Sequence, residues 1–432
     1  MLNVVDDRTL AFRSSGVGEA ISGTSASARS LLVVPILMCM LPFIQLGLTY
    51  WISIEGLAFV LALFAVDKRL SVADMSSCAL ITAAMLVGLI LQPDIVSPIS
   101  AFKHNVSQAI GIFIIVCAAK DTKWNVSQTP LWRLLIVTVV GLVILTLAQY
   151  VTYVFLKDPR FLLPASLYVT GQGTLARSAI EFGRVHGFLA AVRVAATFAE
   201  PSYLGFISMC LTVMVLNSRL RSAAKFGLLT LLLAMVAMSK SASGIIMITV
   251  LIAYAYRSKF TFATFLICVS VTVVFFASTM MLLDFDPIGR LLSSTDPRLE
   301  QSGYIRLIMP LQHAATVLKE APFGVPFSET YEFLAHHSTS YTMMNPTYSY
   351  TGDWIGQDNG LLNLIIQFGW AGFIVIGGVA FAVRDGFILL FLLFATQFNG
   401  SALTPDKVAM ISLALAWKRG DVADRIRDTR PG

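Results

Sequence analysis

The stretch "TFAEPSYLGFISMCLTVMVLN" (residues 197–217) decides how this chain folds, because it sets a carboxylate at the mouth of a long apolar run. Proline is favoured at the first position of a helix, where its missing N–H would have no partner, so a helix is predicted to begin at Pro201. Glu200 then lies at the cap of that helix, where a carboxylate gains roughly 0.3–1 kcal/mol from the helix dipole. Capping is one interpretation of Glu200; a role in chemistry, as a base or as a partner of cations, is the other.

The whole chain has the composition of an integral membrane protein. Of its 432 residues, 56% are hydrophobic and only 13% are charged, which is too apolar for a soluble domain of this length. A helix needs about 20 apolar residues to cross a bilayer, and about twelve candidate runs occur, some of them shorter. They lie at roughly 31–48, 51–66, 75–91, 105–119, 134–155, 201–217, 226–239, 242–256, 260–282, 360–383, 386–399 and 405–417. We therefore predict an all-α polytopic membrane protein with about 12 transmembrane helices.

Basic residues indicate the orientation, because short loops rich in Lys and Arg stay in the cytoplasm. Placing both termini in the cytoplasm puts most basic residues on that side and leaves two large periplasmic loops, at about 157–199 and 283–359. Residues 1–30 are small, polar and aperiodic, so a disordered cytoplasmic tail is expected there. Residues 31–417 then form a single transmembrane domain, and residues 418–432 form a second cytoplasmic tail. The net charge of +6 follows from this arrangement and does not indicate nucleic-acid binding.

Several kinds of site have no motif in this sequence. It contains no glycine-rich phosphate loop, no His and Cys residues at zinc spacing and no GxSxG motif, which argues against nucleotide-driven, zinc-dependent and serine hydrolase chemistry. The five cysteines all fall inside apolar runs, at spacings that match no metal or redox motif. Asp284 and Asp286 resemble the metal-binding triplet of nucleotide-sugar transferases, but they lie on the predicted outer side, where nucleotide sugars are absent. We therefore expect no metal and no cofactor.

The predicted outer side holds more cations than the orientation rule favours. They include Arg177, Arg184, Arg193, Lys240 and Arg306. A cluster of guanidinium groups facing the outer leaflet suits a substrate with phosphate oxygens, which arginine binds bidentately. A lipid-linked diphosphate is the membrane-borne candidate, and pairing with carboxylates or lipid headgroups is the alternative.

The second loop contains a predicted amphipathic helix, "YIRLIMPLQHAATVLKEAP" (304–322). At 3.6 residues per turn, one apolar stripe contains Leu307, Leu311, Ala314, Ala315 and Leu318. Arg306 and His313 lie seven residues apart on another stripe, and Pro310 is expected to kink the helix or to begin it. A helix on the membrane surface, or one docked on the bundle, has this pattern. All five histidines of the chain fall on the predicted outer side, where a lone loop histidine is more often solvated than catalytic.

Five motifs between residues 190 and 407 resemble, in order, those of bacterial exopolysaccharide polymerases of the Wzy type, which are relatives of the O-antigen ligases. They are "RVAATFAEPSYLGF" (193–206), "MSKSASGIIMI" (238–248), "RLIMPLQHAATVLKEAPFGVPF" (306–327), "DNGLLNLIIQFGWAGFI" (358–374) and "QFNGSALTPDK" (397–407). Lys240 stands where the family has an arginine. Asp358 and Asn359 stand where the ligases have a His-Asn pair, so a ligase-type histidine does not carry over, although His336 or His337 could substitute from nearby. A xanthan-type gum polymerase is one candidate within the family.

The resemblance implies a GT-C-like architecture, as in O-antigen polymerases and ligases, and an activity at the periplasmic face of the bacterial inner membrane. That activity is transfer of a growing glycan from undecaprenyl diphosphate to a hydroxyl of the next lipid-linked repeat, by a glycosyltransferase that needs neither metal nor nucleotide. The expected diphosphate ligands are Arg193, Lys240 and Arg306. Glu200 is expected to orient these cations or to act as base, and Asp358 is the competing base. Further candidates are Arg184, His313, His337 and Asn359.

The expected partners are the undecaprenyl-diphosphate-linked oligosaccharide, membrane lipid, and flippase, chain-length or export proteins, with no nucleic acid. Two alternative functions stay open: a ligase that moves a finished glycan to another acceptor, and a polysaccharide or lipid flippase. Transporters usually carry ionisable residues or broken helices at mid-membrane and often internal repeats. The predicted spans hold almost no charge, which favours chemistry outside the membrane.

Overall fold

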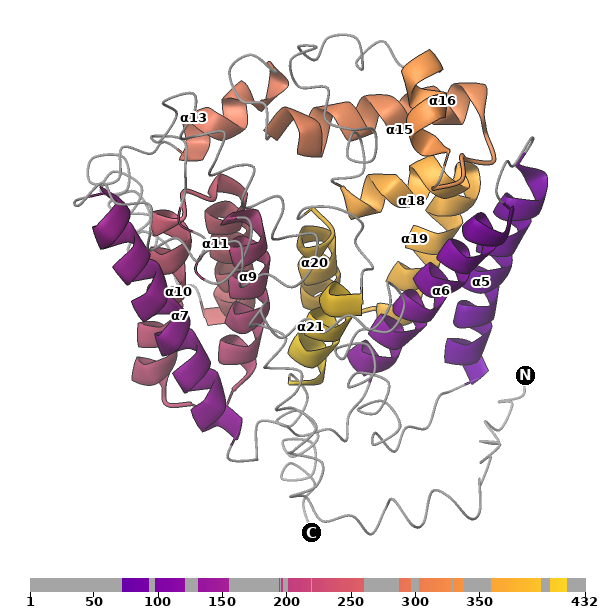
Figure 1. Ribbon diagram of the computed structural model, residues 1–432. Helices are drawn as coiled ribbons and strands as arrows, with labels where there is room; N and C mark the ends of the chain where they lie inside the picture. The colour runs from indigo at the N-terminus through magenta and orange to yellow at the C-terminus, as the bar shows by residue number, and fades with distance from the viewer. Residues whose placement is uncertain are drawn as a thin grey trace, which may run out of the picture.

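The computed structural model describes residues 72–92, 98–120, 131–154, 194, 196, 201–218, 220–259, 287–296, 303–327, 329–337, 359–397 and 405–417. Every regular element in these ranges is a helix, which confirms the all-α prediction for this part of the chain. Figure 1 shows most of the helices side by side in a bundle, with α15 (Met309–Glu320) lying across one end. We call this the capped end of the bundle.

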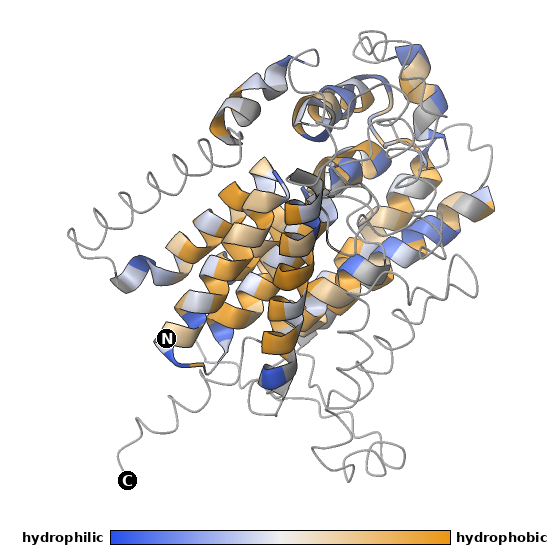
Figure 2. Ribbon diagram, turned by 60° about the vertical axis from the view of Figure 1, so that its left-hand side comes forward, coloured by the Kyte–Doolittle hydropathy of each residue, from blue (hydrophilic) through white to orange (hydrophobic). Residues whose placement is uncertain are grey.

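The described bundle begins with α5 (Val72–Leu91), α6 (Pro98–Lys120) and α7 (Leu131–Val154). In the described ranges, Ala101–Ala119 of α6 and Leu135–Thr152 of α7 are long and apolar enough to cross a membrane, and six further apolar helices are shorter. Figure 2 shows the bundle helices mainly in the colours of apolar residues. The total of about 12 crossings stays a prediction.

The centre of the bundle is formed by α9 (Pro201–Asn217), flanked by α10 (Ser222–Met238) and α11 (Ala242–Tyr256). Helix α9 begins at Pro201, as predicted from the preference of proline for the first helical position. All of residues 204–215 are buried, and most are apolar; the hydroxyl groups of Ser208 and Thr212 donate to carbonyls of the preceding turn of α9. A helix that is buried all round needs no polar face.

A glycine sets the distance between α9 and α11 at the capped end. A Cβ on Gly244 would lie 2.7 Å from Cγ1 of Val236 and 3.3 Å from the Cα of Gly205. Contacts of this kind leave no room for a side chain, so the two helices approach through backbone and small residues. This places the first turn of α9 beside the turn that joins α10 to α11.

One predicted apolar run, 360–383, is two helices in the structure: α18 (Gly360–Phe368) and α19 (Trp370–Val383). Gly369 between them has a backbone φ of 55°, and a Cβ there would collide with the carbonyl of Pro322. Glycine adopts this left-handed conformation without the steric cost of a side chain. The break turns α18 away from the axis of α19 and towards α15.

The C-terminal end of α15 is held at this break. The N–H of Trp370 donates to the carbonyl of Pro322 at 3.0 Å, and the N–H of Val325 donates to the carbonyl of Ile366 at 2.9 Å. Gly324, with a φ of 90°, also has no space for a Cβ against the backbone of α18. We call this crossing of residues 321–325 over Gly369 the glycine clasp.

Two further helices complete the described bundle: α20 (Gly386–Ala395) and α21 (Pro405–Ala416). Asp385 caps α20, because its Oδ1 accepts hydrogen bonds from the N–H groups of Phe387 at 2.9 Å and Ile388 at 3.0 Å. Helix α21 packs against α6 and α9 and is buried along most of its length.

The capped end also carries shorter elements. These are α13 (Pro287–Leu292), the π-helical turn η8 (Tyr304–Ile308) before α15, and α16 (Thr330–His337), together with the 3-10 turn η7 (Ser293–Thr295). A further 3-10 turn, η6 (Arg257–Lys259), follows α11. The predicted break near Pro310 is confirmed, since α15 begins there and proline occupies its first turn.

The face that α15 turns to the bundle overlaps only in part with the predicted apolar stripe. Leu311 is 57% exposed and Leu307 is 37% exposed, whereas Val317 and His313 are completely buried. Ala314, Val317 and nearby apolar residues form a small core with α18 that is separate from the main core of the bundle. The predicted stripe is thus only partly buried, because Ala314 lies in the small core while Leu307 and Leu311 are exposed.

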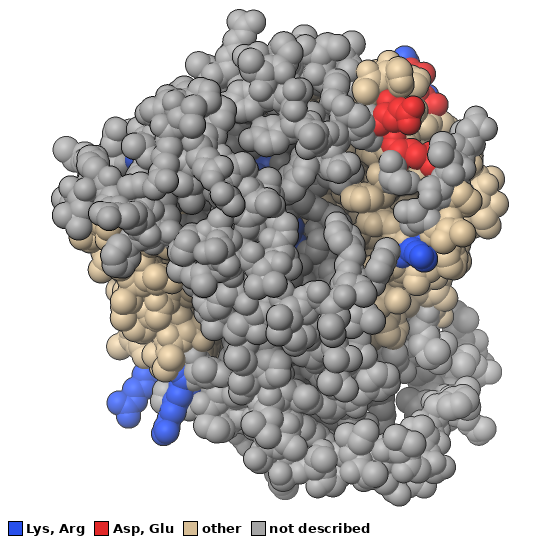
Figure 3. Space-filling model, in the orientation of Figure 1, with Lys and Arg blue, Asp and Glu red and all other residues tan. Residues whose placement is uncertain are grey.

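Exposed acidic side chains lie at the capped end of the described structure, whereas basic side chains lie at both ends. Figure 3 shows acidic side chains gathered at the corner near α16, with basic side chains beside them, and further basic side chains at the end opposite the cap. Described basic residues close to the helix ends on that opposite side are Arg133, Arg221, Lys225, Arg257 and Arg384. Glu320 and Glu332 are exposed at the capped end.

Candidate active site

The guanidinium group of Arg306 lies against the first turn of α9. Arg306 belongs to the π-helical turn η8, and its Nη2 lies 3.5 Å from Oγ of Ser202, which is long for a hydrogen bond but places the two groups in contact. Ser202 is the second residue of α9 and only 3% exposed, while Arg306 is half-buried. The contact joins two of the predicted motifs that are far apart in the sequence. Single π-helical turns occur frequently at functional sites.

Asn359 holds the backbone of Arg306. Its Oδ1 accepts a hydrogen bond from the N–H of Leu362 at 3.1 Å and so caps α18. Its Nδ2 donates to the backbone carbonyl of Arg306 at 3.0 Å and to Oε1 of Gln397, at the end of α20. With a side chain only 2% exposed, Asn359 makes its bonds inside the protein and acts on the position of Arg306.

Lys240 lies in the tight turn between α10 and α11, at the capped end. Its φ of 53° is in the left-handed region, which is uncommon for a residue with a side chain. The turn is closed by bonds from the N–H of Lys240 to the carbonyl of Ala237 at 2.9 Å and from the N–H of Ser241 to the carbonyl of Val236 at 3.3 Å. The serines on both sides are buried and Lys240 is half-buried, so the turn presents one cation at this end.

The segment that leads into α9 is also anchored. Nε2 of Gln149, on α7, donates to the carbonyl of Ala196 at 2.7 Å. The side chains of Val194 and Ala196 are each 2% exposed, and Ala196 has a φ of 53°. A buried hydrogen bond and a left-handed residue together fix the direction of the chain four residues before Glu200.

Four predicted site residues lie outside the described residues: Arg184, Arg193, Glu200 and Asp358. Three of them directly precede described positions, because Val194, Pro201 and Asn359 are the next residues along the chain.

The two histidine candidates have different environments. His313 is completely buried on α15, which contradicts the interpretation of a solvated loop histidine, and burial lowers its pKa to about 4. His337 is exposed on α16, where its Nδ1 lies 2.9 Å from the carbonyl of Phe333 and its ring stacks on that of Phe333. His313 is therefore a neutral group inside the fold, and His337 is engaged with its own helix.

Buried amide groups and the half-buried imidazole of His104, from α6, α18 and the end of α5, meet at the capped end. Nε2 of Gln92 donates to the backbone carbonyl of Gln367 at 2.7 Å, and Nε2 of His104 lies 3.1 Å from Oε1 of Gln367 and 3.3 Å from Nε2 of Gln108. Asn363 lies four residues before Gln367, on the same face of α18. We call Gln92, His104, Gln108, Asn363 and Gln367 the amide band.

Sequence reasoning missed several residues of this region. Ser202 and Gln397 were inside the quoted motifs, where their types gave no sign of the contacts they make. Lys407 is only 3% exposed in the first turn of α21, and a lysine at the edge of an apolar run was the available signal. Among the described residues, no group of three or more His, Cys, Asp or Glu side chains could hold a metal ion.

Comparison with known proteins identifies the family. The model of the WcaD colanic acid polymerase family matches residues 28–420, which is most of the chain and confirms the resemblance to exopolysaccharide polymerases. The family takes its name from colanic acid, whereas xanthan-type gum was the polymer named as a candidate above. No curated protein and no solved structure matches the chain. The chain belongs to the WcaD colanic acid polymerase family, and it is a membrane protein that polymerises the repeat units of an exopolysaccharide.

Proposed function

We propose that this protein joins oligosaccharide repeats carried on undecaprenyl diphosphate, at the periplasmic face of the inner membrane. The contact between Arg306 and Ser202 carries the proposal, because it sets a guanidinium group of the cap beside the residue that follows Glu200 and Pro201. Lys240 adds a second cation from the α10–α11 turn at the same end. Guanidinium and ammonium groups are suited to bind a diphosphate and to stabilise its charge.

The proposed reaction is a glycosyl transfer. A hydroxyl oxygen of the acceptor repeat attacks the anomeric carbon of the donor glycan, and the bond from that carbon to the diphosphate oxygen breaks. The electron pair of the broken bond stays on the diphosphate, where Arg306, Lys240 and Arg193 stabilise the negative charge. The hydroxyl proton passes to a carboxylate. Atoms and charges balance without a nucleotide or a metal ion.

Glu200 is the proposed base, and Asp358 is the competing one. Glu200 precedes the α9 turn that touches Arg306, and Asp358 precedes Asn359, which binds the backbone of Arg306. Both carboxylates are thus one or two residues from groups that contact Arg306. Proton transfer to a positioned base contributes about 10²–10⁴-fold in rate.

The distribution of charge supports the proposed orientation. The described basic residues opposite the cap suit the cytoplasmic side, where short loops retain Lys and Arg. The capped end then faces the periplasm, where lipid-linked repeats are joined.

The decisive variant is Glu200→Gln, which keeps the shape of the side chain and removes its charge. We expect loss of polymer with normal protein abundance and with single lipid-linked repeats still present, measured by gel analysis of glycan extracted from cells. Glu320→Gln, on the exposed face of α15, is the matched control and should leave polymer unchanged. Normal polymer length in the Glu200 variant would remove Glu200 from the reaction and leave it as a cap.

A reconstituted reaction separates the polymerase from its alternatives. Purified protein with defined lipid-linked repeats should give a ladder of products still attached to undecaprenyl diphosphate. A ligase would release the glycan onto another acceptor without a ladder, and a flippase would change neither the length nor the attachment of the glycan.

A further inference from the structure

The capped end contains buried polar atoms that have no hydrogen-bond partner. Within the described residues, these include Oε1 of Gln92, both amide atoms of Asn363 and both ring nitrogens of His313. The side chain of Asn363 is 3% exposed and that of His313 is 0% exposed. An unpaired buried polar group costs on the order of 1–3 kcal/mol, and folded proteins contain few of them. Several at one end of the bundle indicate that another polar group belongs there.

The amide band also contains a contact that cannot be satisfied from both sides. Nε2 of His104 lies near the Oε1 acceptor of Gln367 and near the Nε2 donor of Gln108. One ring nitrogen either donates or accepts, according to the tautomer, and does not do both. Which of the two contacts is a hydrogen bond therefore depends on the tautomer of His104.

His313 and Asn363 lie along the same stretch of the α15–α18 contact. The two helices run side by side from the bond between Asn359 and Arg306 to the glycine clasp. His313 follows Arg306 by two helical turns, and Asn363 follows Asn359 by one. Both side chains therefore lie between the two fixed ends of the contact.

The chemistry of these groups selects the ligand. The amide band contains no charged side chain, and the buried imidazole of His313 is neutral at neutral pH because its pKa is lowered to about 4. Amides and neutral imidazoles each donate and accept hydrogen bonds, and a sugar hydroxyl group does the same. An anionic diphosphate would find its counter-charges at Arg306 and Lys240 instead.

We propose that His313 and the amide band form a subsite for the hydroxyl groups of the sugar residues that follow the diphosphate of the substrate; this rests on the proposed function. His313 lies seven residues after Arg306, about 10 Å along a helix axis, so one extended substrate reaches both. Hydroxyl groups enter when α15 separates from α18. This separation opens the small core that Ala314 and Val317 of α15 share with Ile365 and Ile366 of α18.

The test compares lipid carriers with and without sugar. Full-length protein in lipid nanodiscs is titrated with undecaprenyl diphosphate and with the same lipid carrying one repeat isolated from the producing cells. We expect the parent to bind the repeat-bearing lipid about 10-fold more tightly or better, since each net hydrogen bond is worth about 1 kcal/mol. The double variant His313→Leu, Asn363→Leu should lose this preference and keep the affinity for the bare lipid.

Ser412→Ala is the matched control, because the buried Oγ of Ser412 on α21 also has no hydrogen-bond partner among the described residues. It should keep the sugar preference. Asn363→Ala, which changes the packing less than the double variant, should reduce the preference in the same direction.

An unchanged sugar preference in the double variant would overturn the subsite and would mean that the band holds only water. A parent that binds both lipids equally would overturn it as well. Loss of the preference in the double variant supports the subsite even if the parent forms no product ladder, so failure of the subsite and failure of the proposed polymerase reaction are distinguishable.

Discussion

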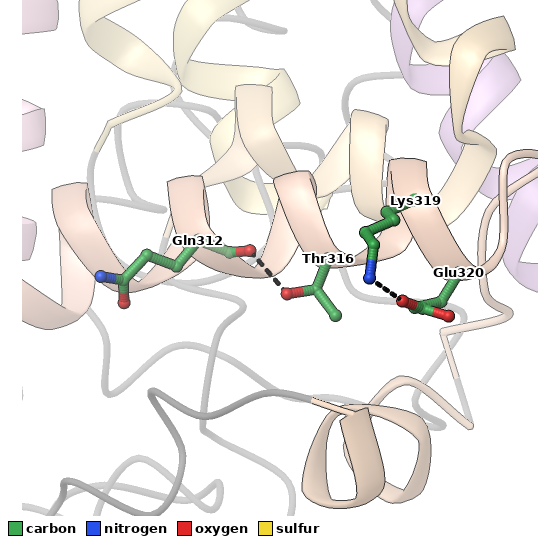
Figure 4. Close-up of polar contacts among 4 residues, drawn as sticks. All are labelled: Gln312, Thr316, Lys319 and Glu320. Carbon is green, nitrogen blue, oxygen red and sulfur yellow. Dashed lines mark hydrogen bonds and ion pairs between the residues drawn. The ribbon is translucent and has the colours of Figure 1, made fainter.

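Helix α9 meets η8, the turn that leads into α15, at the candidate active site, but the fold holds α9 and α15 in opposite ways. Helix α9 is buried on all sides by apolar neighbours. Helix α15 is buried on one face only, and Figure 4 shows Gln312, Thr316, Lys319 and Glu320 along its exposed side. Apolar packing thus fixes Ser202, whereas Arg306 is positioned by the Asn359 bond and by a small separate core.

The difference indicates which part of the site is rigid and which part can move. A helix inside a large core opens only with the whole bundle, while a helix with a small contact area opens at lower cost. The start of α9 is therefore the rigid part of the site, and Arg306 at the capped end is the cation that can adjust to a substrate.

The largest expected effect on activity comes from Arg306, at the capped end of the bundle. Arg306→Ala should lower the rate of polymer formation about 10²–10³-fold, because removal of one group that stabilises developing charge has this magnitude. Arg306→Lys should keep part of the activity, since a point charge replaces a bidentate one. The ladder assay with defined lipid-linked repeats measures both.

Lys319→Ala is the control on the same helix. Lys319 pairs with Glu320 at 2.7 Å, but the lysine side chain is 81% exposed, and exposed pairs contribute little. A loss of activity as large as that of Arg306→Ala would show that the effect is not specific to the guanidinium group beside Ser202.

Low pH is expected to protonate His313 on the buried face of α15. In the unfolded chain His313 has a pKa near 6.5, and in the folded protein about 4, so the unfolded state binds the proton more readily. Stability should be complete above pH 6.5 and should fall between about pH 6.5 and 4, by up to about 1.4 kcal/mol per pH unit.

Thermal unfolding of the parent and of His313→Leu, measured across this pH range, checks the titration. Carboxylates titrate in both proteins, so the difference isolates His313. Parallel curves would mean that the imidazole of His313 is protonated or solvated in the folded state.

The rigidity of α9 is tested through its close packing against α11. Gly244→Val should destabilise the protein by about 1–3 kcal/mol, because the added methyl groups would meet Val236 and the backbone of Gly205. Gly227→Ala on α10 is the control, since a Cβ there meets nothing within 4 Å, and it should stabilise by up to about 1 kcal/mol through helix propensity. Equal effects of the two variants would contradict the close approach of α9 and α11.

The smallest expected effect separates the two roles of Asn359. Asn359→Ala removes the cap of α18 and the bond to Arg306, whereas Asn359→Ser keeps a capping oxygen on a side chain too short to reach the Arg306 carbonyl. We expect the alanine variant to lose about 1 kcal/mol of stability and the serine variant less. Both should lose a similar part of the activity; full activity of Asn359→Ser would show that the cap is all that Asn359 provides.

Local signals in the sequence predicted the elements well where the cause is local. Proline begins α9 at Pro201 as predicted, and the run 242–256 is α11 to the residue. Arg306 and Asn359, taken from separate motifs, are joined by a hydrogen bond. The predicted positions of Arg193, Glu200 and Asp358 remain predictions.

Features that depend on distant contacts were not predictable. The break at Gly369 exists because the Pro322 carbonyl approaches from another element, and the buried position of His313 depends on how η8 leads into α15. The amide band joins Gln92 to Gln367 across 275 positions, and single polar residues in apolar runs do not reveal their partners. Periodicity identifies the faces of a helix, and tertiary packing decides which face is buried.

The glycine clasp is a pivot for α15. The C-terminal end of α15 is held where Gly324 crosses Gly369, because the backbones there are too close for a side chain. Arg306 lies at the other end, before the start of α15. Sixteen residues at about 1.5 Å each make an arm of about 24 Å, so a tilt of about 10° at the clasp displaces Arg306 by about 4 Å. Once the bond from Asn359 to the Arg306 carbonyl opens, a tilt about the two glycines would therefore carry the cation along an arc over the start of α9.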